Sequence, residues 1–432
     1  MNREEILKKQ RDYLFPAVKN YYEEPVILTH GKGARVSGHD GEDYLDFFGG
    51  ILTVSVGHAQ ADVNRAVIAQ VERLSHVSAL YPSIPMVTLA ETLAEITPGD
   101  LQKCFFTASG TEADETAVMM AQVYTGNLEL IALRHGYSGR SLLAQSLTAH
   151  GPWRAVSSQV AGIKHALAPY CYRCPLKKSY PSCEMACATD LEELIQTTTT
   201  GQVAGMIAEP ILGVGGFITP PPEYFEIVAG IVRKYGGVFI ADEVQTGFGR
   251  TGKMWGIDHS GVVPDMMTMA KGIANGFPLG AVVALPSIAD SLKKNSLSTF
   301  GGNPVSTAAA NATIDVILRD KLTGSAGVQG TLLRDGLEGL KEKYPEVVGD
   351  VRGMGLMQAM ELVVDEQSGD RTPNPDAALR FMEETKNRGL LIGRGGLYGN
   401  SLRIAPPLNI TRSEVEAALQ IMDDALAAMA AR

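Results

Sequence analysis

The sequence lacks the features of a membrane-spanning, secreted or nucleic-acid-binding protein. No apolar run approaches the ~18 residues that a bilayer-spanning helix needs. The N-terminal stretch MNREEILKKQRDYLF is charged, has no apolar signal-peptide core and contains acidic residues that argue against a transit peptide. A net charge of -10 argues against nucleic acid or an anionic membrane surface as the main partner. We therefore expect a cytoplasmic protein.

Cysteine is also scarce. Four of the five cysteines cluster in one segment, at Cys171, Cys174, Cys183 and Cys187. An odd total in a chain without a secretion signal favours reduced thiols. The CxxC and CxxxC spacings are compatible with a structural zinc ion, and the alternative is a surface insertion whose tyrosines pack against the thiols. No metal is assigned to the functional site.

The composition is that of a globular enzyme with two domains. The 432 residues are 45% hydrophobic and 20% charged, and a chain of this length buries a substantial core. Strand-like pieces at 26–28 and 44–48 are followed by helical patterns at 61–74 and 86–96. Strands and helices then alternate, which predicts an α/β fold with a mainly parallel sheet whose ligands bind beyond the C-terminal strand ends.

A second, smaller unit begins at about residue 320. Its patterns predict a strand pair over 347–362 and three helices, over 329–345, 376–389 and 413–430.

The segment MMTMAKGIANGFPLGA places a lysine at the end of an apolar strand. Lys271 follows the run 266–270 and is followed by Gly272, Gly276 and Pro278, which indicate a loop. Partial desolvation there favours the neutral, nucleophilic amine. The alternative is a strand-end lysine that simply reaches solvent.

Three other predicted strands end in residues that suit a ligand. The strand 103–108 leads through Ser109, Gly110 and Thr111 into a helix, whose free N–H groups attract an anion such as phosphate, although an ordinary helix cap is the alternative. Tyr137 follows the strand 128–133 and can lie flat against a planar ring, or can be a rim residue. Glu209 ends the strand 203–208, where it can orient a ligand or cap a loop.

The most informative carboxylate is Asp242. It ends the fully apolar strand 237–241, where an aspartate is costly unless it is paired with a cation or a strong donor. One sheet edge would therefore carry a lysine, an aspartate, an anion pocket and a flat aromatic ring. These groups match pyridoxal 5'-phosphate (PLP), with Asp242 facing the pyridine nitrogen and Lys271 acting as covalent anchor and general acid/base.

Several runs then resemble the class III (omega-type) aminotransferases of fold type I. They are AEPI at 208–211, DEVQTGFGRTG at 242–252, AKG around Lys271 and TFGGNP at 299–304. Within that family the similarity is greatest to the alanine–glyoxylate aminotransferase 2 branch, through LDFFGGILTVSVGH, GLLIGRG at 389–395 and LRIAPPLNIT at 402–411. The resemblance implies a large PLP-binding domain over 61–319 and a small discontinuous domain formed by 1–60 and 320–432.

The resemblance also implies roles for individual residues. Lys271 would hold PLP covalently, and Asp242 would pair with the ring nitrogen. Ser109, Gly110 and Thr111 would bind the phosphate, while Tyr137 and Val244 would pack against the two ring faces. Gln245 would contact the ring hydroxyl, and Glu209 would support it from behind. Thr299 would reach the phosphate of a neighbouring subunit, so the protein would be a homodimer with shared active sites.

Arg403 would bind the substrate carboxylate, since a guanidinium forms a bidentate pair with it. In ornithine- and GABA-type members a glutamate can neutralise this arginine, and the matching position here is Val214. This difference favours pyruvate or glyoxylate as acceptor and leaves the donor open among alanine, β-amino acids and ω-amines. The alternatives to a transaminase are a PLP-dependent phospholyase acting on a phosphorylated amino alcohol and a non-catalytic binding protein of the same fold.

Overall fold

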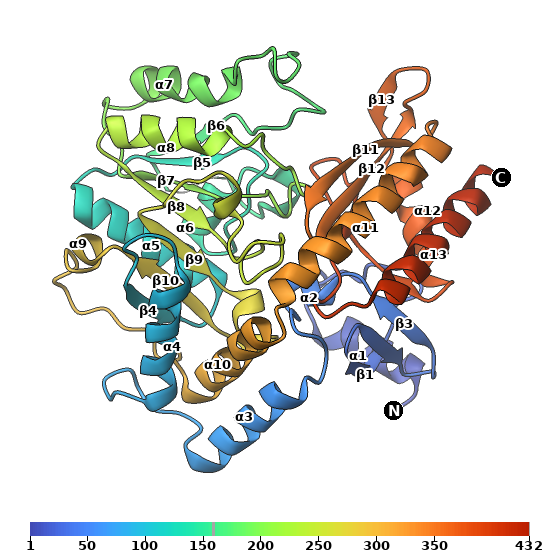
Figure 1. Cartoon of the computed structure of the whole chain (residues 1–432), viewed down its shortest axis with the longest axis horizontal. Helices are drawn as coiled ribbons and strands as arrows, with labels where there is room; N and C mark the ends of the chain where they lie inside the picture. Colours follow the sequence, from blue (N-terminus) through green and yellow to red (C-terminus); the bar gives the residue numbers. More distant parts are fainter. Residues whose placement is uncertain (158–159, 432) are drawn as a thin grey trace.

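A seven-stranded sheet forms the centre of the larger of two lobes in the computed structural model (Figure 1). The structure describes residues 1–157 and 160–431. The strand order is β4-β10-β9-β8-β7-β5-β6. Of the strands described in this sheet, six run in one direction and only β10 runs in the opposite direction. The bounds are β4 Lys103–Thr107, β5 Leu130–Leu133, β6 Ile163–Ala166, β7 Gly205–Ala208, β8 Val238–Asp242, β9 Met266–Met269 and β10 Gly280–Ala284. The predicted mainly parallel sheet is confirmed, although β6 and β10 were not predicted.

Both faces of this sheet are covered, which explains its continuous apolar strands. In β8, Phe239 packs into the core that holds α8 (Tyr224–Lys234), whereas Ile240 packs with α5 (Gly110–Thr125) on the other face. Successive strand residues point to opposite faces, so every residue of β8 is buried. The strand therefore delivers Asp242 to a buried position at the edge where the parallel strands end.

The other helices of the larger lobe surround this sheet. They are α3 Ala61–Arg73, α4 Ile84–Ile96, α6 Leu142–Leu147, α7 Ala186–Thr198, α9 Pro286–Ala289 and α10 Pro304–Arg319, with 3-10 turns η1 Gly151–Trp153, η2 Ile257–His259 and η3 Lys271–Ala274. The helices predicted over 61–74 and 86–96 are confirmed as α3 and α4.

The smaller lobe contains two further sheets. One has the order β1-β2-β3-β14 and the other β11-β12-β16-β15, with β13 beside β12. The bounds are β1 Leu28–Lys32, β2 Arg35–Gly38, β3 Asp43–Asp46, β11 Val348–Met354, β12 Met357–Asp365, β13 Asp370–Pro373, β14 Leu390–Leu391, β15 Gly393–Gly395 and β16 Ser401–Ile404. Because β14 pairs with β3 in parallel, N-terminal and C-terminal parts of the chain share one sheet. The domain boundaries at 60/61 and 319/320 stay a prediction.

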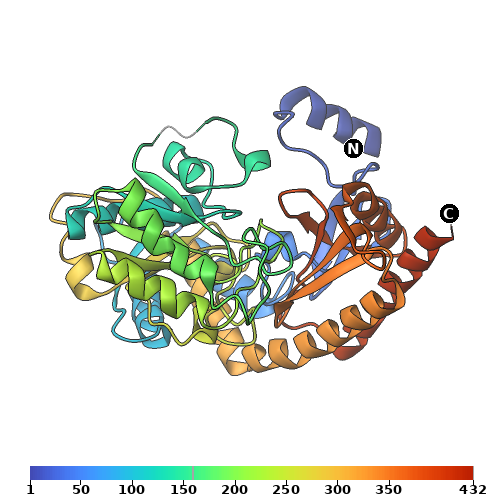
Figure 2. The same cartoon turned by 90° about the horizontal axis from the view of Figure 1, so that it is seen from above.

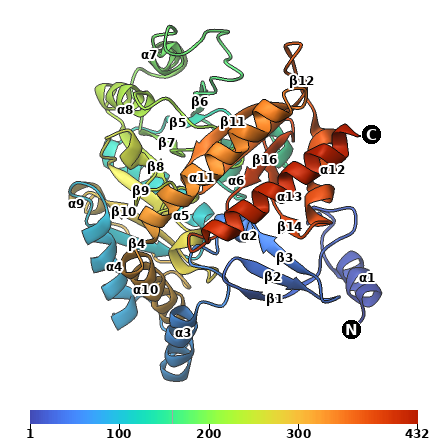
Figure 3. The ribbon, with the colours of Figure 1, turned by 45° about the vertical axis from the view of Figure 1, so that its right-hand side comes forward.

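Helices cover the smaller lobe and connect it to the larger one. They are α1 Arg3–Tyr13, α2 Gly49–Leu52, α11 Leu322–Lys343, α12 Pro375–Lys386 and α13 Arg412–Ala430. The long helix α11 begins beside α10 and continues along β11 and α13 (Figure 3). The N-terminal helix α1 buries none of its residues and lies at the outside of the lobe (Figure 2). None of the described helices is both long and apolar enough to span a bilayer.

Two local predictions were wrong. The strand predicted at 26–28 instead begins at Leu28 and continues to Lys32, because its register is set by the hairpin with β2, in which Lys32 lies opposite Arg35. The helix predicted from residue 329 begins at Leu322, where Leu322 and Ala326 are buried despite the glycines between them that weaken the pattern.

Candidate active site

Nine of the residues singled out in the sequence line one cavity of about 330 Å³ at the sheet edge. They are Ser109, Gly110, Thr111, Tyr137, Glu209, Asp242, Val244, Gln245 and Lys271. Asp242 is the last residue of β8, and the others come from the segments that follow β4, β5, β7, β8 and β9. The parallel direction of these five strands explains why segments far apart in the chain meet here.

Lys271 follows β9 after one residue, Ala270, and begins the 3-10 turn η3, where a plain loop was expected. Its φ of 47° lies in the left-handed region, which costs a non-glycine residue roughly 1–2 kcal/mol. The next residue must be small, since a Cβ on Gly272 would lie 2.6 Å from Ser55 Oγ. Burial lowers the pKa of Lys271, and the Asp242 and Glu209 carboxylates oppose this effect. The backbone thus presents a desolvated amine to the cavity.

Two buried carboxyls accompany the lysine. Asp242 is 4% exposed and accepts a hydrogen bond from the backbone N–H of Val244 at 3.0 Å. Glu209 accepts from the backbone N–H groups of Tyr137 at 3.0 Å and Gly213 at 2.8 Å, so it ties together two loops that line the cavity. Burial raises the pKa of Asp242 to about 6 and that of Glu209 to about 8.

The start of α5 forms the anion-binding end of the cavity. Ser109 is the N-cap residue, and its Oγ accepts a hydrogen bond from the backbone N–H of Glu112 at 3.3 Å, as in an ordinary helix cap. The capping bond leaves the N–H groups of the first helical residues, Gly110 and Thr111, without intrahelical acceptors. The backbone is closely packed here, because a Cβ on Gly139 would lie 2.0 Å from Thr111 Oγ1.

The two residues predicted to pack against the ring, Tyr137 and Val244, each contact a different neighbour. The Tyr137 ring makes an edge contact with Trp153, with centroids 5.8 Å apart. Val244 packs over the helix start, since a Cβ on Gly110 would lie 3.3 Å from both of its methyl carbons. Both side chains therefore have fixed neighbours on the cavity wall.

Arg403 does not line the cavity itself but contacts a residue that does. The residue is 3% exposed, and its Nη2 donates to Oε1 of the cavity residue Gln245 at 3.5 Å. Its guanidinium carbon Cζ lies over two aromatic rings, 4.9 Å from the centroid of Phe48 and 5.1 Å from the centroid of Phe217. Nε has no hydrogen-bond partner, and no carboxylate of the described residues forms an ion pair with this side chain. A buried guanidinium without an anionic partner can accept a carboxylate in a bidentate pair.

Thr299 is not part of this cavity. It lies in the exposed segment between α9 and α10, beside Phe300, which is 62% exposed. Within a single chain the structure therefore does not bring Thr299 to the other site residues.

Sequence reasoning missed three residues around the site. Asp114 is buried and lines the cavity, and Phe48 and Phe217 enclose Arg403. Helical spacing could have indicated Asp114, which lies four residues after Gly110 and so on the same face of α5. No sequence signal places the two phenylalanines on Arg403, because the three residues come from distant segments.

The cysteine cluster gives no support to the zinc interpretation. Cys171, Cys174, Cys183 and Cys187 are all free thiols and line a small cavity of about 20 Å³ together with tyrosines 170 and 180. Within residues 1–157 and 160–431, no three His, Cys, Asp or Glu side chains are arranged to hold a metal ion. The segment thus agrees with the alternative of a packed insertion.

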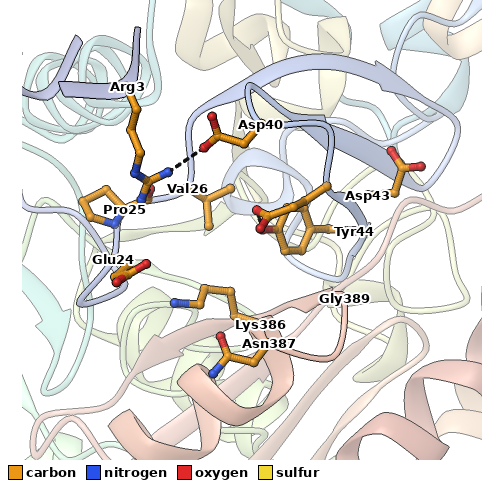
Figure 4. A pocket seen from close by; sticks show the side chains of 11 residues that line it. Arg3, Glu24, Pro25, Val26, Asp40, Asp43, Tyr44, Lys386, Asn387 and Gly389 are labelled. Atoms are coloured by element: carbon orange, nitrogen blue, oxygen red, sulfur yellow. Dashed lines mark hydrogen bonds and ion pairs between the residues drawn. The ribbon is translucent and has the colours of Figure 1, made fainter. Parts of the chain in front are cut away.

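A second cavity, of about 470 Å³, lies away from the predicted residues (Figure 4). It separates the N-terminal segment from the smaller lobe, where Lys386 faces Glu24 and the Arg3–Asp40 ion pair of 3.1 Å closes one side. None of the residues of the first cavity lines it. The Arg3–Asp40 ion pair attaches the N-terminal segment to the lobe.

Comparison with known proteins agrees with the geometry. Residues 17–426 match the family model described as aminotransferase class-III. The chain is 44% identical to alanine–glyoxylate aminotransferase 2 homolog 2, mitochondrial, of Arabidopsis thaliana, over 98% of this chain and 87% of that protein. It is 37% identical to alanine–glyoxylate aminotransferase 2, mitochondrial, of Homo sapiens, over 98% and 86%.

Solved structures show the same fold. The amine transaminase of an uncultivated Pseudomonas species, described as PLP-bound, superposes with a TM-score of 0.89 at 32% identity, over 96% of this chain and 98% of that one. Transamination is therefore favoured over the phospholyase and the non-catalytic alternatives. Fold, cavity and relatives together place this chain in the class-III aminotransferases, and it is a PLP-dependent enzyme that transfers amino groups.

Proposed function

We propose that Lys271, Asp242 and the start of α5 hold PLP for the transfer of an amino group to a small 2-oxo acid. The observation that carries the proposal is the convergence of nine residues from five strand ends on one cavity. The residues fit PLP: a desolvated amine, a buried carboxyl, a helix start for phosphate and an aromatic side chain surround one space. When bound, PLP accepts the electrons released as a bond to the substrate's α-carbon breaks.

The protein's own groups supply binding and proton transfer. Lys271 Nζ, whose pKa is lowered by burial, can anchor the cofactor and later accept or return a proton at the substrate carbon. Asp242 would hold the proton on the ring nitrogen. The N–H groups of Gly110 and Thr111 would bind the phosphate, and Tyr137 and Val244 would orient the ring.

The role of Lys271 is tested by Lys271→Ala. The wild-type protein with PLP should show a visible absorbance band that survives dialysis and bleaches when alanine is added. The variant should lose this band and nearly all transamination, because no other amine lines the cavity among the described residues. Full activity in Lys271→Ala would refute the assignment.

We further propose that Arg403 selects substrates with an α-carboxylate, such as pyruvate or glyoxylate. Support comes from the burial of Arg403, from its unpartnered Nε and from the apolar residue Val214 beside it. Val214 lies close to Arg403, since a Cβ added to Gly395 would be 2.7 Å from Arg403 Cδ and 3.0 Å from the Val214 carbonyl oxygen. The enclosing rings hold the guanidinium in place, which favours one fixed carboxylate position.

A donor–acceptor activity matrix tests this selection. Arg403→Ala should raise KM for pyruvate and glyoxylate by roughly 10- to 100-fold, the loss expected for a charge-assisted hydrogen-bonded pair. Arg403→Lys should recover only part of it, because an ammonium cannot form the bidentate pair. The control is Arg412→Ala, which removes an exposed arginine paired with Glu416. Unchanged KM values in Arg403→Ala would contradict the proposal, and the same matrix identifies the donor.

A homodimer with shared active sites is the third part of the proposal. Support comes from exposed apolar side chains on neighbouring segments, including Ile84 (81% exposed) and Phe300 (62% exposed), which contacts His76 with ring centroids 5.6 Å apart. Such exposed clusters are typical of protein interfaces. The exposed Thr299 belongs to the same surface.

Mixed dimers test the sharing. If Thr299 serves the partner's site, a dimer of one Lys271→Ala and one Thr299→Ala subunit contains one site with both changes and one intact site. Random mixing of the two variants should then raise activity above the average of the two separate variants, by up to about one quarter of wild-type activity if Thr299→Ala alone is inactive. Activity that equals only the average of the two separate variants would show that each site is built from one chain.

We propose cytoplasmic residence on the net charge of -10, which argues against an anionic membrane surface as a main partner. Both relatives named above carry the word mitochondrial in their names. Cell fractionation decides the matter, and enrichment in an organelle fraction would contradict the proposal.

A further inference from the structure

A second carboxyl group, that of Asp114, lies next to Asp242 inside the protein. Asp114 belongs to α5, is 1% exposed and lines the active-site cavity. Asp242 lines the same cavity, and its charge raises the pKa of Asp114 more than that of any other charged group, with the Thr268 side chain on β9 also acting on both carboxyls. The proposed function uses Asp242 and leaves Asp114 without a role.

Polar atoms in the cluster of Asp114, Asp242 and Thr268 lack hydrogen-bond partners when both carboxyls are ionised. Asp114 Oδ1 is buried without a partner, and so is Thr268 Oγ1. Asp242, in contrast, has the backbone N–H of Val244 as a donor to Oδ1. Two adjacent carboxylates repel each other and cannot bond to one another, because neither has a proton to donate. One proton placed between the two carboxyls removes their repulsion and supplies a hydrogen bond between them.

We propose that Asp114 is a neutral carboxylic acid that donates its proton to the Asp242 carboxylate and thereby positions Asp242 for the cofactor. Asp242 then remains the acceptor of two hydrogen bonds, from Val244 N–H and from Asp114. Asp114 is a positioning residue, since it acts on the cofactor through Asp242. The inference rests on the proposed role of Asp242.

The surrounding charges favour the proton on Asp114. Burial, followed by the Asp242 charge, raises the pKa of Asp114 well above its ordinary value, whereas the pKa of Asp242 rises only to about 6. The other charged groups that act on Asp114 are Glu209 at the end of β7, which also raises its pKa, and Lys271 after β9, which lowers it. Asp242 is thus the member of the pair that ionises first.

The proton is tested on the protein without cofactor. Infrared difference spectra between wild type and Asp114→Asn at neutral pH should show one carbonyl stretch of a protonated carboxylic acid that the variant lacks. The matched control is Asp335→Asn, an exposed carboxyl on α11, which should remove no such band. Glu209→Gln and Glu243→Gln identify the bands of the other buried carboxyls. Absence of any protonated-carboxyl difference for Asp114→Asn would overturn the proposal.

Proton linkage gives an independent measurement. A carboxyl that is protonated in the native state and ionised in the unfolded chain stabilises below its unfolded pKa, and this stability is lost as the pH rises towards its native pKa. The folding equilibrium constant of wild type relative to Asp114→Asn should fall by about tenfold per pH unit above about pH 4. A constant ratio across pH would contradict a proton on Asp114.

The positioning role is tested by PLP affinity. Asp114→Asn keeps a donor of the same shape and should bind PLP within about threefold of wild type, whereas Asp114→Leu removes the donor and should weaken binding by roughly tenfold or more. Equal affinities of the two variants would overturn the positioning role. If Asp114→Leu fails to fold, the comparison of Asp114→Asn with wild type in the infrared and linkage measurements still decides the proposal.

Failure of the proposed function gives a different pattern. If Asp242→Asn binds PLP like wild type, Asp242 does not face the ring. The infrared band and the proton linkage that distinguish wild type from Asp114→Asn would still be observed. If Asp242→Asn loses PLP binding while Asp114→Asn shows no lost band, the role of Asp242 stands and the inference about Asp114 is wrong.

Discussion

Burial decides the protonation of individual residues around the active site. Desolvation lowers the pKa of Lys271 and raises those of Asp242 and Glu209, so each is moved towards its neutral form. The sequence predicted Lys271 and Asp242 because each follows an apolar strand at the ligand-binding edge. It did not predict Phe48 and Phe217, because their contact with Arg403 exists only after distant segments meet.

His150 gives a pH-dependent prediction at this scale. It is 1% exposed, neither ring nitrogen has a hydrogen-bond partner of good geometry, and burial lowers its pKa from 6.5 to about 4. The unfolded chain therefore binds a proton between these pH values and the native protein does not. This stability is present above pH 6.5 and is lost as the pH falls towards 4, by up to about 3 kcal/mol.

Urea unfolding of wild type and His150→Gln across this pH range measures the effect. The variant should show a smaller loss of unfolding free energy on acidification, whatever its stability at neutral pH. Replacement of the exposed His39 by Gln serves as the control and should leave the slope unchanged. Identical slopes for wild type and His150→Gln would show that His150 is protonated in the native state.

At the scale of elements, the loops after the strands are held by close backbone packing. The loop after β7 is one case, because Gly213 donates its N–H to Glu209 and lies against the side chain of Gln245. Sequence patterns located the strands β4, β5, β7, β8 and β9, whose apolar runs are continuous. They did not locate β6 and β10, and they began α11 too late, because short or glycine-containing segments depend on neighbours for their structure.

Gly213→Ala should damage the site without unfolding the protein. A Cβ at this position would lie 2.1 Å from Gln245 Nε2, so Gln245 must leave its place between the cavity and Arg403. We expect weaker PLP binding and a higher KM for 2-oxo acids, measured by cofactor titration and steady-state kinetics.

The matched control is Gly230→Ala in α8, where an added Cβ meets nothing within 4 Å. This change should leave cofactor affinity unaltered and stabilise the helix by about 0.5–1 kcal/mol. Should Gly213→Ala bind PLP as Gly230→Ala does, Gln245 is not held by this loop.

At the scale of the whole molecule, a buried ionic network joins the two lobes. Glu361 on β12 accepts from Arg352 Nη1 at 2.6 Å, from Arg173 Nε at 2.5 Å and from the Tyr170 hydroxyl. Tyr170 and Arg173 belong to the cysteine-containing segment of the larger lobe, and Arg352 belongs to β11 of the smaller one. Glu361 is fully buried, so its charge depends on these partners.

Glu361→Gln should destabilise the protein by about 3–5 kcal/mol, since it leaves the Arg173 charge without a counter-charge and Arg352 with Asp350 alone. Thermal or denaturant unfolding measures this loss. The comparison is Asp62→Asn, which breaks exposed ion pairs with Arg65 and Arg319 and should change stability little. A loss no larger for Glu361→Gln than for Asp62→Asn would mean that the network does not hold the lobes together.

The sequence by itself determined the parallel sheet, the edge at which its strands end and the chemical groups placed there. It could do so because these features depend on local runs of apolar residues and on the residue that follows each run. Only the tertiary structure decided that Asp114 lies beside Asp242, that two rings enclose Arg403, and that Thr299 is outside the cavity of its own chain. Contacts between segments far apart in the chain leave no periodic pattern, because they arise from packing and not from local conformation.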